Sequence, residues 1–198
     1  MEIPRKFIDY VFTKRVAALR ALMRGETPRE RVLIEFTRTL PAVITDGPAG
    51  LSGSIKMVSI LPRQDVLPRV LDRLRELEGY SSERIFEVLV HEVYREDVLD
   101  FSRLGALELA KKHTWTNIRA TKRATLLFFT PPIESYEVRC SVEIHEGDEV
   151  AQYLNYLHKL VHRAKRVDYP AYVFIIEEIY DNSDSPDGYG RLIYRRLA

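Results

Sequence analysis

The chain has 198 residues and an almost balanced charge, with 30 Lys and Arg against 29 Asp and Glu and a formal net charge of +1. A hydrophobic content of 45%, including 10% aromatic residues, is enough for a sizeable core and argues against a disordered chain. The net charge near zero argues against a protein whose main task is to coat nucleic acid or an anionic membrane.

The cysteine count and the hydropathy pattern exclude further classes. Cys140 is the single cysteine, so an internal disulfide framework and a Cys-rich zinc or iron–sulfur site are excluded. No apolar run approaches the ~20 residues that span a bilayer, and the charged first residues show no signal peptide, so we expect a cytoplasmic protein. Arg outnumbers Lys by 22 to 8 and amides are scarce, which is typical of a heat-adapted source.

The first forty residues carry a helical pattern. One apolar stripe recurs at helical spacing from Phe7 to Leu22. Gly25 and the pair Thr27–Pro28 then provide a stop and a restart, and a second helix is expected from about Arg29 to Leu40. We therefore predict an N-terminal helical segment over 1–40 and an α+β barrel-like domain over 41–198, forming one structural unit.

Two β-prone runs follow, at 43–45 and 55–61, and the stretch between them is rich in glycine. This stretch is not a phosphate loop, because it lacks the Gly-Lys-Ser/Thr ending and leads into a strand rather than a helix. Residues 64–78 predict a strongly amphipathic helix that ends at Gly79.

The middle of the chain is less clear. Over 85–94 apolar residues occur at both odd and even positions, which favours a strand buried on both faces, with a helix as the close alternative. Residues 99–112 are predicted to be helical from the spacing of Leu104, Leu107, Leu109 and Ala110.

The C-terminal half gives the clearest pattern. A short strand at 125–129 ends at Pro131–Pro132, and residues 136–144 then alternate between apolar and polar side chains, as in a strand with one wet face. Residues 148–166 predict a helix with acids at its start and bases at its end. A strand at 171–180, a loop at 181–190 and a short strand at 191–194 complete the chain.

Several short strands interrupted by single helices indicate an α+β domain. Two architectures fit: a small, mostly antiparallel barrel with helices packed outside, or a ferredoxin-like sheet with helices on one face.

Charge is uneven along the chain. Residues 131–150 hold one Arg and six acids, whereas residues 101–130 hold one acid, Glu108, and six bases. The six bases are Arg103, Lys111, Lys112, Arg119, Lys122 and Arg123.

The basic stretch has the composition of an anion site. Lys112 and Arg119 can give charge-assisted hydrogen bonds, and Thr114, Thr116 and Asn117 can give directional ones. A phosphate-bearing small molecule is one interpretation. An exposed basic loop with a helix cap is another, and nucleic acid is a third.

The segment Thr114-Trp115-Thr116-Asn117-Ile118, followed by Arg119 to Phe129, resembles the flavin-binding region of FMN-binding split-barrel proteins. That group includes pyridoxamine-phosphate-oxidase-like proteins and flavin reductases. The resemblance implies that Thr114 and Asn117 lie near the phosphate or ribityl chain of FMN. It also implies that the segment beginning at Pro41 matches the opening hairpin of the family, with Lys56 or Ser59 facing the flavin.

The resemblance further implies a homodimer with the flavin at its interface and redox chemistry supplied mostly by the cofactor. It leads us to predict an FMN-binding, flavoprotein-like domain, with a possible oxidoreductase activity on an unidentified substrate. The alternative is a cofactor-free α+β interaction module whose basic segment contacts an acidic partner or RNA.

Other residues are weaker candidates. His158 and His162 share a helix face at metal-compatible spacing, but the Glu of a zinc-protease helix is absent. Cys140 is predicted to be a buried, inert thiol. The acidic loop from Asp181 to Asp187 lacks the spacing of a calcium loop. Trp115 with Tyr10, Tyr94 and Tyr136 could stack bases only if they are exposed along a basic groove.

Overall fold

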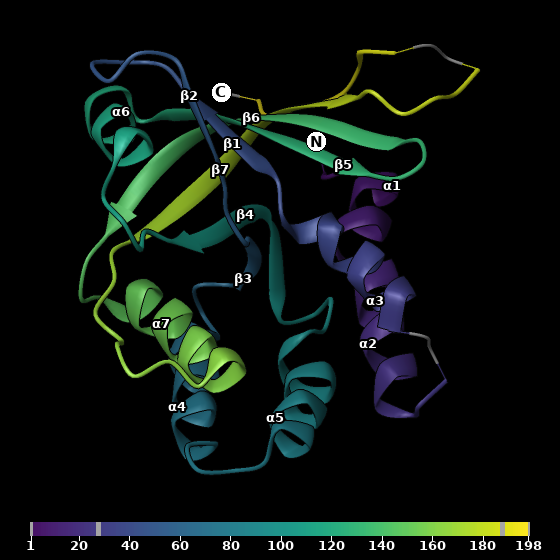
Figure 1. Cartoon of the computed structure of the whole chain (residues 1–198), viewed down its shortest axis with the longest axis vertical. Coiled ribbons are helices and arrows are strands. Elements are labelled where there is room, and N and C mark those ends of the chain that lie inside the picture. The colour runs from purple at the N-terminus through teal and green to yellow at the C-terminus, as the bar shows by residue number, and fades with distance from the viewer. Residues whose placement is uncertain (1, 27–28, 187–188, 198) are drawn as a thin grey trace.

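The computed structural model describes residues 2–26, 29–186 and 189–197, and within them it contains one eight-stranded sheet flanked by helices (Figure 1). The strand order is β2-β1-β5-β6-β7-β4-β3, with β8 paired to β7, and neighbouring strands run antiparallel. The strands are β1 (Ala42–Thr45), β2 (Ser52–Ile55), β3 (Ser59–Pro62), β4 (Leu99–Leu107), β5 (Arg123–Thr130), β6 (Glu134–His145), β7 (Ala171–Asp181) and β8 (Arg191–Arg195).

This sheet confirms the predicted fold class, a mostly antiparallel α+β arrangement of the split-barrel type with flanking helices. The sheet is not closed: β2 and β3 form the two ends of its strand order, and the described residues contain no pairing between them. The ferredoxin-like alternative is therefore not the one found.

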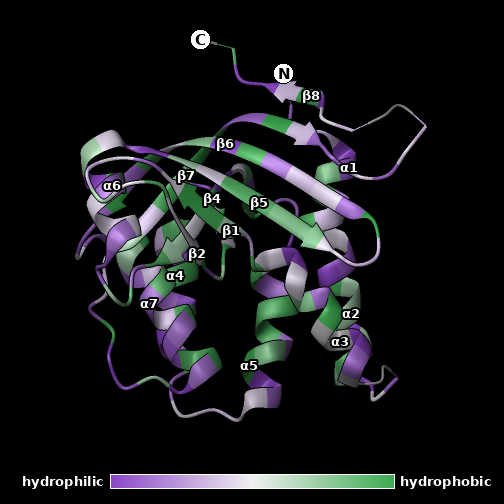
Figure 2. Ribbon diagram, turned by 45° about the horizontal axis from the view of Figure 1, so that its top comes forward, coloured by the Kyte–Doolittle hydropathy of each residue, from purple (hydrophilic) through white to green (hydrophobic). Residues whose placement is uncertain are grey.

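Strand β6 shows why the C-terminal half was predictable. Tyr136, Val138, Cys140 and Val142 are buried and alternate with more exposed residues, which is the predicted two-residue period (Figure 2). The strand pairs with β5 on one side and β7 on the other, so this apolar row enters the main core.

The predicted helices of the first forty residues are present. They are α1 (Arg5–Ile8), a π-helical turn (Asp9–Thr13), α2 (Lys14–Met23), α3 (Arg29–Phe36) and a 3₁₀ turn (Thr37–Thr39). The predicted break at Gly25 is found, with a φ of 70°, while Thr27 and Pro28 lie outside the described residues. Phe7 packs against Phe128 and Tyr136, with ring centroids 5.9 and 5.3 Å apart, so the first helices belong to the core of the sheet.

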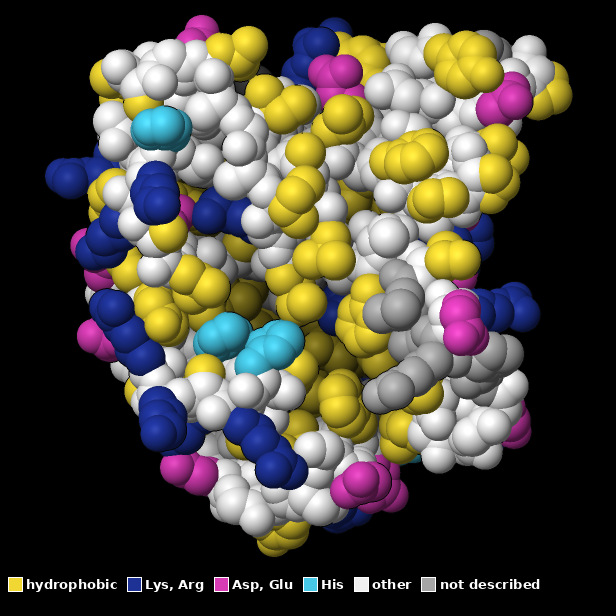
Figure 3. Space-filling view, viewed as in Figure 1, with side chains coloured by type: hydrophobic (Ala, Val, Ile, Leu, Met, Phe, Trp, Pro, Cys, Tyr) yellow, Lys and Arg dark blue, Asp and Glu magenta, His cyan; other side chains and the backbone are white. Residues whose placement is uncertain are grey.

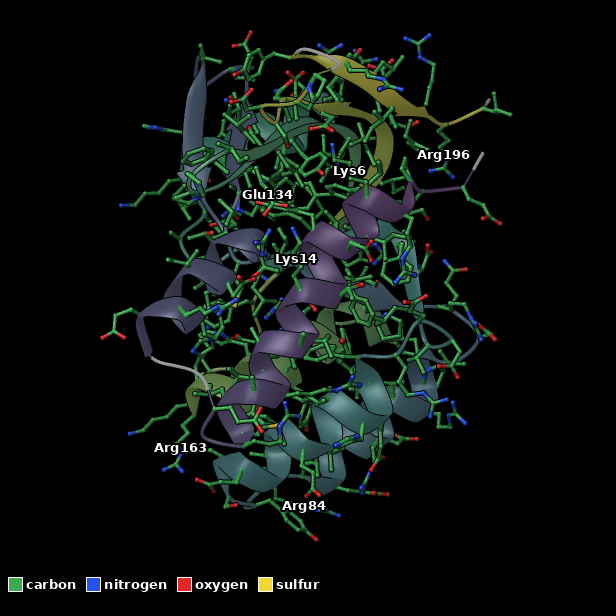
Figure 4. All side chains as sticks on the ribbon, turned by 90° about the vertical axis from the view of Figure 1, so that its right-hand side faces the viewer. Lys6, Lys14, Arg84, Glu134, Arg163 and Arg196 are labelled. Atoms are coloured by element: carbon green, nitrogen blue, oxygen red, sulfur yellow. The ribbon has the colours of Figure 1, made fainter. Side chains whose placement is uncertain are left out.

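A buried ion network also joins these helices to the β5–β6 hairpin. Arg38, whose side chain is 6% exposed, donates to Glu35 at 2.6 Å and to Glu134 at 2.7 Å. Lys14 reaches the same Glu134 at 2.5 Å (Figure 4). The segment 1–40 thus shares both apolar and ionic contacts with the rest of the chain, while a division at residue 40 stays a prediction.

A second layer of helices covers the other end of the sheet. It comprises α4 (Leu67–Glu76), α5 (Ser82–Val88), a π-helical turn (Leu89–Val93) and α7 (Glu149–His162), with a core of their own. Helix α7 begins where Asp148 accepts a hydrogen bond from the Ala151 amide at 2.9 Å and ends at Arg163, which has a φ of 52°. The predicted helices 64–78 and 148–166 are confirmed with shorter bounds. Among the described residues no helix is long and apolar enough to cross a membrane.

The preferred strand at 85–94 is wrong, and the helical alternative is correct. Ile85, Val88, Leu89 and Val93 are buried on one helical face, and the Ser81 hydroxyl accepts a hydrogen bond from the Arg84 amide to start the helix. A run with apolar residues at both odd and even positions is compatible with a buried strand and with a helix. Packing in one core with α4 and α7 favours the helix here.

The predicted helix at 99–112 is also wrong. Residues Leu99–Leu107 form β4, which pairs with β3 and β7, and the helix follows as α6 (His113–Thr121). Tertiary pairing overrides the helical spacing of leucines here. The predicted strand 55–61 is interrupted as well, since Lys56–Val58 separate β2 from β3.

Candidate functional site

A cavity of about 470 Å³ lies between the β2–β3 connection, the end of β4 and helix α7. Figure 3 shows the hollow in the middle of one face, with hydrophobic side chains inside it and histidines at its edge. Its size falls within the ~300–1,000 Å³ range of small-molecule pockets. The lining residues are Arg15, Ser54–Ser59, Tyr94, Gly105–Ala110, Leu154, Leu157, His158, Val161 and His162.

A charged pair forms one wall of the cavity. The Lys56 ammonium donates to Glu108 Oε2 at 2.8 Å, and the side chains are 11% and 3% exposed. The hydroxyl of buried Tyr172 donates to the same oxygen at 2.8 Å. Lys56 also lies over the Tyr172 ring, 5.4 Å from its centroid. The positive charge of Lys56 is therefore balanced within the wall.

Glu108 also shapes the turn between β4 and α6. Its Oε1 accepts hydrogen bonds from the amides of Ala110 at 2.8 Å and Lys111 at 2.7 Å, and Lys111 adopts a φ of 50°. Burial alone raises the pKa of Glu108, but the hydrogen bonds from Lys56, the turn amide and Tyr172 outweigh it and lower the pKa. Glu108 is thus an ionised carboxylate whose two oxygens each accept two hydrogen bonds.

Helix α7 provides the opposite wall through Leu154, Leu157 and Val161, with two histidines beside them. The rings of His158 and His162 lie 4.9 Å apart. Burial and the neighbouring His162 lower the pKa of His158, so this imidazole is neutral at pH 7. The described residues contain no group of three metal-ligating side chains that could hold an ion around this pair.

Of the two residues that the sequence motif singles out, Asn117 holds the β1–β2 loop and Thr114 contacts strand β2. Asn117 is fully buried; its Oδ1 accepts from the Ala49 amide at 2.8 Å, and its Nδ2 donates to the Gly50 carbonyl at 2.7 Å. Thr114 is buried and bonds through its hydroxyl to the Ser54 hydroxyl at 2.9 Å. Helix α6 is thereby fixed to the strand that leads into the cavity.

The other predicted site residues divide into two groups. Lys56 and Ser59 line the cavity. Lys112, Thr116 and Arg119 lie on the exposed side of α6, outside the cavity lining. Their roles, like those of Thr114 and Asn117 toward a flavin, stay predictions.

Helix α6 also corrects the expectation that the basic motif is a loop. Trp115 is half-buried on this helix, 6.1 Å from the Tyr172 ring, with the cations of Lys111 and Arg119 at 5.0 and 5.6 Å from its centroid. The indole is thus engaged with its own neighbours rather than displayed with Tyr10, Tyr94 and Tyr136 along one groove.

Sequence reasoning missed Arg15 as a site residue and mentioned Glu108 only as a charge. The available signal for Glu108 was its position as the single acid in the basic stretch 101–130. Arg15 carried no local signal, because it enters the cavity from the distant helix α2.

Two weaker candidates are resolved as expected. Cys140 is buried, and burial raises the pKa of its thiol, which makes it an inert core residue. Asp181 pairs with Lys6 and accepts from the Ser183 amide, so it serves the fold, while Asp187 lies outside the described residues.

Comparison with known proteins gives the fold a context. No protein-family model and no curated protein matches the chain. Among solved structures, HupZ of Group A Streptococcus matches with a TM-score of 0.50 at 12% identity, covering 83% of this chain and 98% of that one. A putative pyridoxamine 5'-phosphate oxidase from Lactobacillus delbrueckii has a TM-score of 0.42 and 19% identity, covering 78% and 93%. A pyridoxamine 5'-phosphate oxidase-related, FMN-binding protein from Nostoc punctiforme has a TM-score of 0.43 and 8% identity, covering 78% and 83%.

At these identities the HupZ match establishes a shared fold and nothing about activity. The other two scores fall below 0.5, so the fold assignment rests on HupZ and on the sheet topology.

Proposed function

We propose that this protein binds FMN in the cavity between the β2–β3 connection, the end of β4 and helix α7. The observation that carries the proposal is the composition of that cavity: about 470 Å³ with leucine and valine walls, and two cations, Lys56 and Arg15, among the lining residues. A flat, largely apolar ring with an anionic tail matches such a lining, so the residues present fit FMN.

Individual residues have separate roles in the proposal. Lys56 uses one hydrogen-bond donor on Glu108 and keeps others for a ligand oxygen, and the Ser59 hydroxyl lies in the same lining. Thr114 and Asn117 act indirectly, by holding the strand and loop that carry Lys56. Lys112, Thr116 and Arg119 remain candidates for the phosphate from the exposed side of α6.

When bound, FMN would supply hydride acceptance or donation at its ring for an oxidoreductase activity. The chain itself supplies binding and exclusion of water. The leucine and valine side chains of α7 make one wall apolar, and the ionised Glu108 holds Lys56 in a fixed position against the other. No residue of the cavity is assigned here as a general acid or base.

A homodimer is part of the proposal. Ile55, Met57 and Leu109 line the cavity and are 66%, 41% and 54% exposed, so apolar surface surrounds its mouth. Contiguous exposed apolar side chains are typical of protein interfaces. Sedimentation equilibrium of the wild type should give twice the chain mass, and the double variant Ile55→Lys, Leu109→Lys should sediment as a monomer.

The FMN proposal is tested by filling the cavity. Val161→Trp introduces a large ring on the α7 wall and should weaken FMN binding at least tenfold in a fluorescence-quenching titration. Val167→Trp is the matched control, since Val167 is 38% exposed and outside the lining, and it should bind FMN like the wild type. Equal FMN affinity for Val161→Trp and wild type would show that the flavin does not enter this cavity.

A second candidate function has one observation in its favour. Lys112, Lys122 and Arg123 are exposed around α6, and the described residues give them no ion pair. Such a face can contact an acidic partner or RNA without a cofactor. Filter binding to RNA should then be salt-dependent and should be lost when all three are changed to Glu. Absence of RNA binding at low salt removes the RNA version of this candidate.

A further inference from the structure

The inner end of the cavity contains a cation that the protein does not neutralise. Arg15 lines both the large cavity and an adjoining one of about 20 Å³, together with Val58, Ser59 and Tyr94. The Nε atom of Arg15 is buried and has no hydrogen-bond partner among the described residues. The contact that the structure gives its guanidinium is with the Tyr94 ring, 5.9 Å from the centroid.

Arg15 is half-buried, and two cations with more deeply buried side chains both have carboxylate partners. Lys56, in the same cavity, has Glu108 at 2.8 Å, and Arg38 has Glu35 and Glu134 at 2.6 and 2.7 Å. Among the described residues no carboxylate lies within ion-pair distance of Arg15. A guanidinium taken out of water is costly without an anion, so an anion brought by a ligand is the natural complement.

Neutral donors accompany the cation. The hydroxyls of Ser59 and Tyr94 belong to residues that line both cavities with Arg15. Tyr153 lies outside both linings, and its hydroxyl is buried without a hydrogen-bond partner among the described residues. Burial raises the pKa of both Tyr153 and Tyr94, while Arg15 and Ser59 act in the opposite direction on both phenols. These phenols therefore remain protonated at neutral pH and can donate to an oxygen acceptor.

We infer that Arg15, with Ser59 and Tyr94 beside it in the lining, forms an oxyanion site that takes the carboxylate or phosphate of a small ligand whose apolar body lies along the α7 wall. A guanidinium has a planar fork of donors that matches two oxygens of such a group. The oxyanion has two possible sources, the phosphate of FMN itself or the carboxylate of a second ligand. The first source rests on the proposed FMN binding, and the second does not.

Paired probes, in which one member carries an anionic group that the other lacks, test this site on the full-length chain. FMN is compared with riboflavin, which lacks the phosphate, and decanoate with decanol, by titration calorimetry. The wild type should prefer the charged member of at least one pair tenfold or more. Arg15→Gln should abolish that preference while leaving the affinity for the uncharged member unchanged, and Arg15→Lys should retain part of it.

Arg20→Gln is the matched control, because Arg20 lies on the same helix and is exposed. It should behave like the wild type. Loss of the FMN–riboflavin preference in Arg15→Gln identifies the flavin phosphate as the source. Loss of the decanoate–decanol preference, with FMN affinity intact, identifies a second ligand.

The inference is overturned if the wild type shows no charge preference in either pair, a result that requires no variant to fold. It is also overturned if Arg15→Gln keeps the wild-type preference. Failure of FMN to bind contradicts the proposed function alone, since the decanoate pair still reports on Arg15.

Discussion

Replacing Glu108 by Gln tests the charged wall of the cavity. The substitution keeps the size of the side chain but removes the negative charge that faces Lys56, whose side chain is only 11% exposed. Removing one partner of a buried ion pair costs about 3–5 kcal/mol. Each oxygen of Glu108 accepts two hydrogen bonds, one from Lys56 and Tyr172 and the other from the turn amides. The NH2 group of a glutamine would replace one of these oxygens, and it would face two donors without being able to accept from either.

We therefore expect Glu108→Gln to lower the free energy of unfolding by about 3–5 kcal/mol, which corresponds to a fall of about 10–15 °C in melting temperature for a chain of this size. Urea denaturation followed by the fluorescence of Trp115, the one tryptophan, measures it. The double variant Lys56→Met, Glu108→Gln should lose less than the sum of the single variants, because the unpaired charge is gone. A loss below about 1 kcal/mol in Glu108→Gln would refute the reasoning.

The remaining predictions concern the hydrogen bonds of Asn117 to the β1–β2 loop, the packing around Gly105, the pH dependence of stability and the melting temperature. Asn117→Ala should cost about 2–4 kcal/mol by urea denaturation, because two loop hydrogen bonds lose their partner, whereas exposed Thr116→Ala should change stability by less than about 0.5 kcal/mol. Gly105→Ala should destabilise by about 1–3 kcal/mol, since its Cβ would lie 2.7 Å from Leu61, while Gly53→Ala has open space and should be neutral. Because the pKa of Glu108 is lowered in the folded state, its ionised form stabilises the fold fully above its ordinary pKa of ~4.3, and this stabilisation is lost as pH falls through the folded-state pKa. The free energies of unfolding of wild type and Glu108→Gln should therefore differ by a constant amount at pH 6–8 and converge in acid. The high content of charged residues and the scarcity of amides predict a melting midpoint above the ~45–65 °C of mesophile domains, and calorimetry showing a midpoint within that range would contradict a heat-adapted source.

Elements with an unambiguous period were predictable from the sequence. Strand β6 and helix α7 each carry one apolar face over more than ten residues, and the structure has both. The preferred strand at 85–94 was wrong because its apolar residues fit both periods, and the predicted helix at 99–112 was wrong because strand pairing overrides the helical spacing of its leucines. Their type is decided by long-range partners, α7 for the first and β7 for the second.

The candidate site was predictable only in part, for a related reason. Lys56 and Ser59 follow from a resemblance of the opening hairpin, and they do line the cavity. Glu108 and Arg15 reach the same cavity from β4 and α2, and nothing in their local sequence links them to Lys56. The Thr114–Asn117 motif was recognisable, but the structure shows that its polar atoms bind the protein's own loop, a use that sequence spacing does not distinguish from ligand binding.

Direct titration of the purified wild-type protein with FMN tests the central claim most simply. The account predicts saturable binding of one FMN per chain, seen as quenching of flavin fluorescence, with the occupancy lost when Val161→Trp fills the cavity. Absence of saturable FMN binding by the wild type, or full occupancy in Val161→Trp, would contradict it.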